Sequence, residues 1–77
     1  MKNDYKIRTN CAVLLNEQNE VIEAVKDDEI KKKIENLTQV YPKVILHYYS
    51  AYSIAELDQN DEETQVLLGA GFIKLKE

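Results

Sequence analysis

Hydrophobic and polar residues alternate along the first part of the chain. Every second residue from 5 to 15 is apolar or of a strand-forming type: Tyr5, Ile7, Thr9, Cys11, Val13 and Leu15. The residues between them are polar at first, whereas Ala12 and Leu14 make both faces apolar near the end. A period of two predicts a half-buried strand over 5–15, with its apolar end nearer the centre of a sheet.

A short polar segment, 16–19, separates this strand from a second run of strand-forming residues at 21–25. The segment contains Asn16 and Asn19, which can adopt the left-handed backbone conformation that a tight loop needs. Two strand-like runs joined by so few polar residues predict a β-hairpin.

The next apolar residues follow a helical period. They are spaced by four, three and four residues: Ile30, Ile34, Leu37 and Tyr41. Asp27 or Asp28 can cap the first free amides of a helix here. Pro42 ends the element, because the residue before a proline is pushed out of helical geometry. The pattern predicts the main helix over 27–40, with one apolar face.

Residues 43–52 are apolar or aromatic on both faces, which is typical of an internal strand. The following segment, 53–57, fits two structures. Ser53 and Glu56 match a helix capping box, whereas Ile54 continues the strand alternation. The sequence leaves both open.

The last part of the chain predicts a short helix over 62–68 and a terminal strand over 72–75, with Gly69 and Gly71 as helix stops. The resulting order is ββαβαβ. We therefore expect an α+β fold: a small mixed or antiparallel sheet of 3–4 strands with one main helix and one short helix packed on it. A second core would need roughly 50 further residues, so residues 1–77 should form a single small domain.

The composition narrows the classes of function. Ten basic residues stand against 14 acidic ones, giving a net charge of −4. Arg8 is the only arginine, so binding to nucleic acid is unfavourable, because phosphates select basic surfaces and the arginine fork. A negative field favours a basic protein partner instead. The longest apolar run has five residues, 11–15, whereas a membrane span needs about 20, so we expect no membrane insertion.

The reactive residues are few. Cys11 is the only cysteine and is expected to fill the core; without a disulfide, a cytoplasmic location is favoured over secretion. His47 is the only histidine and is expected to be a strand residue with one satisfied hydrogen bond rather than a catalytic base. The turn that begins at Asp58 resembles the start of a calcium loop but has Glu63 where the loop glycine should stand. We therefore expect no enzyme activity, no metal site and no cofactor.

Two groups of residues are candidates for contact with a partner. Three tyrosines fall within five positions, at Tyr48, Tyr49 and Tyr52, and four acidic residues surround a turn, at Asp58, Asp61, Glu62 and Glu63. Strand alternation places Tyr48 and Tyr52 on one face and Tyr49 on the other. One set should pack in the core, and the other should be free for contact.

These features lead to a ranked set of functions. The first is a small acidic protein-interaction module, that is, an inhibitor, adaptor or assembly subunit that binds another protein, for example a basic one. Free sheet edges would also allow a homodimer. The second is an acidic mimic of nucleic acid that inhibits a host nuclease or DNA-binding protein. The third is a sheet that binds single-stranded nucleic acid through Tyr48 or Tyr49.

Overall fold

The computed structural model describes residues 1–76 and has six strands and two α-helices. In chain order the elements are β1 (Lys2–Ile7), β2 (Cys11–Leu15), β3 (Val21–Lys26), the 3-10 turn η1 (Asp27–Glu29), α1 (Ile30–Leu37), β4 (Ile45–Tyr49), β5 (Ile54–Asp58), α2 (Glu62–Gly69) and β6 (Ile73–Leu75). Glu77, the last residue of the expected 1–77 domain, lies outside the described residues.

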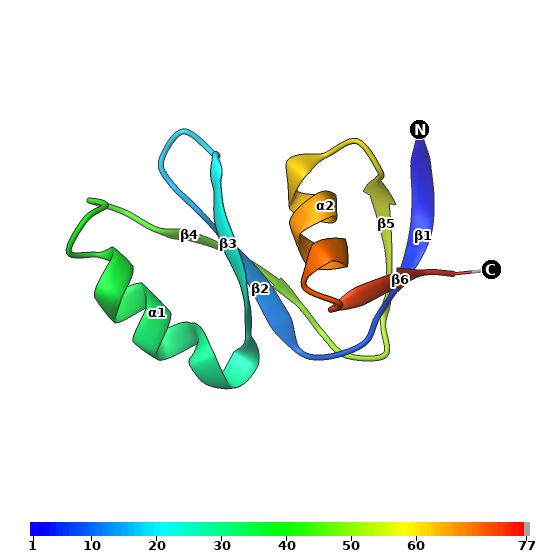
Figure 1. Cartoon of the computed structure of the whole chain (residues 1–77), viewed down its shortest axis with the longest axis horizontal. Coiled ribbons are helices and arrows are strands. Elements are labelled where there is room, and N and C mark those ends of the chain that lie inside the picture. Colours follow the sequence, from blue (N-terminus) through cyan, green and yellow to red (C-terminus); the bar gives the residue numbers. More distant parts are fainter. Residues whose placement is uncertain (77) are drawn as a thin grey trace.

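The strands form two antiparallel sheets of three, in the orders β5-β1-β6 and β3-β2-β4. In Figure 1, β1 runs on into β2 and β4 runs on into β5, so the two sheets share one bent pair of chain segments. Helix α2 lies between the sheets, and α1 lies at the far end of the molecule, on the other side of β3-β2-β4. The chain is accordingly elongated, measuring 41 × 25 × 16 Å.

The α+β class is confirmed, but the expected single sheet and the order ββαβαβ are wrong in detail. The predicted strands 5–15 and 43–52 do not run through as expected: the first breaks at residues 8–10, and the second ends at Tyr49 before the bend at 50–53. The alternation did not reveal the first break because Ile7 and Cys11, four residues apart, still face the same side after the bend. Alternation of apolar and polar residues does not reveal a bend after which the same set of alternate residues still faces the core.

The structure decides the conformation of residues 53–57 and the length of the main helix. Residues 54–58 form a strand, β5, because β1 offers them a complete antiparallel partner from Lys6↔Ile54 to Lys2↔Asp58. The main helix is shorter than the predicted 27–40: a 3-10 turn precedes it, and it ends at Leu37. Hydrogen-bonded turns follow, including the amide of Tyr41 donating to the carbonyl of Leu37 at 2.8 Å.

The core lies between the two sheets and α2. Its buried members are Tyr5, Ile7, Cys11, Val13, Leu15, Leu67, Phe72 and Ile73. The inward face predicted for the first strand is therefore correct, apart from Thr9, which is half-buried at the bend. Cys11 is a buried free thiol, and burial raises its pKa, as expected for an apolar filler rather than a reactive group.

One buried side-chain oxygen has no hydrogen-bond partner among residues 1–76. It is the hydroxyl of Thr64, which is fully buried in α2. Replacing Thr64 by Val should therefore raise the free energy of unfolding by about 1 kcal/mol, because the shape is kept and an unsatisfied hydroxyl is removed. Chemical denaturation of Thr64→Val measures the gain, with Thr64→Ser as the control that keeps the hydroxyl and loses the methyl. A less stable Thr64→Val would show that the hydroxyl has a partner after all.

Candidate functional site

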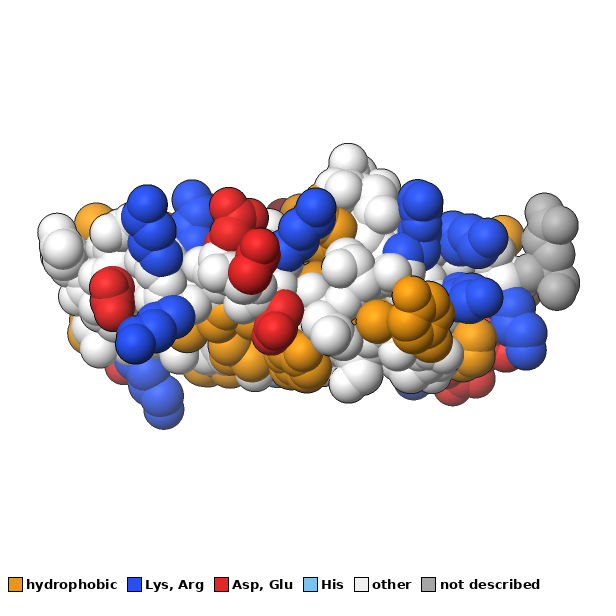
Figure 2. All heavy atoms as spheres, turned by 90° about the horizontal axis from the view of Figure 1, so that it is seen from below, with side chains coloured by type: hydrophobic (Ala, Val, Ile, Leu, Met, Phe, Trp, Pro, Cys, Tyr) orange, Lys and Arg blue, Asp and Glu red, His pale blue; other side chains and the backbone are white. Residues whose placement is uncertain are grey.

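Exposed apolar side chains follow one another along β4, the bend after it and β5. We call Leu46, Tyr48, Tyr52 and Ile54 the tyrosine row; they are 36, 46, 81 and 47% exposed. Their neighbours Ile45, Tyr49 and Ala55 instead pack against the core. Because successive side chains on a strand point to opposite faces, Leu46, Tyr48 and Ile54 point away from α2. Figure 2 shows hydrophobic side chains exposed on the underside, both near the charged α1 end and farther along the molecule.

The row stays open because α1 covers only part of its face. Leu46 lies opposite Leu14, and Tyr48 lies opposite Ala12. Leu14 and Ala12, on the central strand, are fully buried, whereas Leu46 and Tyr48, on the neighbouring edge strand, are not. On the opposite edge, Lys33 of α1 lies 3.4 Å from Glu23 of β3, which ties the helix to that side.

Tyr52 sits at the bend with a backbone conformation that is unfavourable for a bulky residue. Its φ is +67°, in the left-handed region. Several hydrogen bonds hold the bend. Among them, the amide of Tyr52 donates to the carbonyl of Ile7 at 2.8 Å, the amide of Ala51 donates to Oδ1 of Asn10 at 2.7 Å, and the hydroxyl of Ser53 donates to the carbonyl of Ser50 at 2.6 Å. The fold thus presents an aromatic ring to water at a backbone cost of about 1–2 kcal/mol.

On the opposite face of β4, three side chains form a polar network. His47 Nδ1 lies 2.9 Å from Oε1 of Glu63, and the hydroxyl of Tyr49 donates to Oε2 of the same carboxylate. His47 and Tyr49 are two residues apart on β4, so both face the first turn of α2, where a carboxylate is also favoured by the helix dipole. Burial and the bond to Glu63 raise the pKa of Tyr49 well above its usual value.

The network borders an acidic groove of about 260 Å³. We define the acidic groove by its lining residues: Leu15, Asn19, Val21, His47, Asp61, Glu62 and Glu63. Its carboxylates come from the start of α2, and its apolar residues come from the end of β2 and the start of β3. The groove can therefore receive a long side chain with an apolar stem and a positive end.

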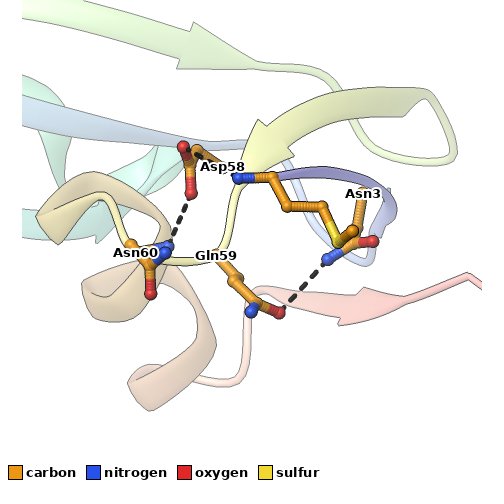
Figure 3. A network of polar contacts seen from close by, with 5 residues as sticks. Asn3, Asp58, Gln59 and Asn60 are labelled. Carbon is orange, nitrogen blue, oxygen red and sulfur yellow. Dashed lines mark hydrogen bonds and ion pairs between the residues drawn. The ribbon is translucent and has the colours of Figure 1, made fainter.

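The seven residues expected to contact a partner fall into three places. Tyr49, Asp61, Glu62 and Glu63 lie in or beside the acidic groove, and Tyr48 and Tyr52 belong to the tyrosine row. Asp58 joins neither, since it accepts a hydrogen bond from the amide of Asn60 at 2.9 Å and lies 3.5 Å from the N-terminal amino group (Figure 3). These contacts, the Asn60 bond first, lower the pKa of Asp58. Asp58 thus holds the turn between β5 and α2.

His47 lies in β4 and makes one side-chain hydrogen bond, as expected of a strand histidine. The partner was not foreseen: it is a carboxylate, and the His47 side chain is 49% exposed at the groove. The alternation correctly gives His47 and Tyr49 one face. Nothing in the sequence shows that the carboxylate of Glu63, 16 positions after His47, lies against that same face.

The groove offers the carboxylates of Asp61, Glu62 and Glu63 and the imidazole of His47 for ionic and hydrogen-bonding contacts. Glu63 orients the imidazole of His47 through Nδ1. Across residues 1–76, the structure contains no group of three or more His, Cys, Asp or Glu side chains that could hold a metal ion. Within the same range, none of the helices has the length and apolar character needed to cross a membrane.

In comparisons with known proteins, no protein-family model, curated protein or solved structure matches the chain.

Proposed function

We propose that this chain is a protein-interaction module that binds another protein through the tyrosine row. The observation that carries the proposal is the exposure of four large apolar side chains in succession, with Tyr52 81% exposed and held in a left-handed conformation. Burying such a ring against a partner would repay its backbone cost. Tyrosine is also enriched where protein interfaces contribute most of their binding energy.

The two alternatives from nucleic-acid recognition receive less support. Tyr48 and Tyr49 lie on opposite faces of β4, and the hydroxyl of Tyr49 is bound by Glu63. The two rings therefore share no stacking surface, and Tyr48 is left as the one tyrosine on the open face of β4. The four acidic side chains of the β5–α2 region do not form one exposed array either, because Asp58 pairs with the N-terminus and Glu63 with His47 and Tyr49.

Affinity capture from the cells that make the chain tests the proposal. The wild type is compared with the double variant Tyr48→Ala/Tyr52→Ala and with a control, Val40→Ala/Leu75→Ala, which removes two exposed apolar side chains elsewhere. A partner should be recovered with the wild type and the control, and about tenfold less or worse with the tyrosine variant, because central interface aromatics typically cost 2 kcal/mol or more when truncated. Equal recovery by all three proteins, or no recovery, would contradict it.

A further inference from the structure

The two edges of the sheet β3-β2-β4 differ in how they are protected against pairing with another strand. The β3 edge carries Glu23 and Lys26, faces a register irregularity at Leu14/Leu15, and has α1 tied to it by Lys33. Charges, irregular pairing and covering helices are the usual means of blocking an edge.

The β4 edge has none of these protections. Residues 45–49 contain no lysine, arginine, proline, aspartate or glutamate, and the pairing of β4 with β2 runs from Cys11↔Tyr49 to Leu15↔Ile45 without a register shift. A regular, uncharged edge strand is a template for one more strand. Its two faces also differ: the tyrosine row lies on one side, and the acidic groove lies on the other.

We propose that the partner adds an extended segment to the β4 edge, and that this segment alternates apolar and basic residues. The inference rests on the proposed function and names how the partner is recognised. Strands in a sheet lie about 4.8 Å apart, so one set of partner side chains would lie beside Leu46 and Tyr48. The alternate set would lie beside His47 and Tyr49. A lysine or arginine there would extend toward Glu63, Glu62 and Asp61 in the acidic groove.

A second copy of this chain fits the same edge poorly. If β4 paired with β4 of a second copy about a two-fold axis, the acidic grooves of the two copies would lie close to each other. No basic residue lines the groove. Like charges that face each other across strands are destabilising. Charge complementarity therefore selects a different, basic segment rather than the homodimer that free edges alone would allow.

The test uses the full chain and a synthetic peptide, slightly longer than β4, in which valine and lysine alternate. Three further peptides are compared with it: one with every lysine replaced by glutamate, and two with backbone N-methyl groups on one edge or on the other. Titration followed by NMR gives the affinities, and amide hydrogen exchange locates the pairing. We expect the valine–lysine peptide to protect the amides of β4 from exchange. The glutamate peptide should not bind the chain, and only one of the two N-methylated peptides should lose binding.

Charge variants of the protein test the groove. Glu62→Gln and Asp61→Asn should each weaken peptide binding roughly two- to fivefold, the effect of one exposed ion pair. Asp28→Asn makes the same change in net charge, in η1 rather than in the groove, and should leave the affinity unchanged. Light scattering on the free chain should give the monomer mass of 8.9 kDa.

Any of four results would overturn the inference: protection of β3 instead of β4, equal binding of the lysine and glutamate peptides, no peptide binding at all, or a stable dimer of the free chain. These failures are separable from failure of the proposed function. A captured partner that depends on Tyr48 and Tyr52 but leaves the β4 amides exchanging freely would refute edge addition and keep the tyrosine row as the interface.

Discussion

Replacing Leu67 by Ala should lower the free energy of unfolding by about 2–5 kcal/mol, the range for truncating a fully buried leucine. Leu67 is fully buried, and its helix, α2, lies between the two sheets (Figure 1). Truncation removes contacts with the core that joins the sheets and leaves a cavity that the strands cannot close without losing register. A chain of this size has only about 4–12 kcal/mol of stability to lose.

Denaturant unfolding of Leu67→Ala and Leu68→Ala side by side checks this expectation. Leu68 is the next residue on the same helix but is 40% exposed, so its truncation should cost well under half as much. Helix propensity changes equally in the two variants, and the comparison isolates burial. If both variants lost the same stability, α2 would not be packed between the sheets as described.

Stability should also fall steeply at alkaline pH, because of Tyr49. Burial and the neighbouring Glu63 carboxylate raise the pKa of Tyr49 in the folded chain above its ordinary value of 10.0. Above pH 10 the unfolded chain loses this proton and the folded chain keeps it, so unfolding becomes easier as pH rises. As the unfolded chain loses this proton, the loss of stability approaches the limiting slope for one proton, about 1.4 kcal/mol per pH unit.

Tyr49→Phe removes the titrating group and provides the test. Its stability at pH 7 should be lower than that of the wild type by about 1 kcal/mol, the net contribution of one hydrogen bond. Between pH 10 and pH 12 its stability should decline less than that of the wild type, so the two curves converge. Tyr52→Phe is the control, since Tyr52 is 81% exposed. Parallel curves for the wild type and Tyr49→Phe would mean that Tyr49 ionises as freely in the folded chain as in the unfolded one.

The tyrosine row and the acidic groove lie on the two faces of one edge strand, and neither is a complete site alone. The row provides apolar contact area, and the groove provides charge. The proposed function combines the two in one surface, which would bind an extended protein segment with two different faces.

The candidate site was only partly predictable. Tyr48, Tyr52 and Glu63 were recognised from composition and spacing, because an aromatic cluster and an acidic cluster are visible in a linear sequence. The hydrogen bonds of Glu63 with Tyr49 and His47 could not be predicted, because they depend on which face of β4 packs against α2. Asp58 was assigned to the acidic surface, whereas its contacts with the N-terminal amino group and with Asn60 give it a structural role.

The sequence by itself determined the α+β class, the inward face of the first strand, the hairpin, and the positions of both helices to within a few residues. These are local properties, set by periodicity and by capping or breaking residues over a few positions. Only the tertiary structure decided that residues 54–58 pair as a strand, that the bends at 8–10 and 50–53 divide the strands between two sheets, and that the helices lie on opposite faces of one sheet. Those choices depend on contacts between residues distant in sequence, which the period of a single segment does not encode.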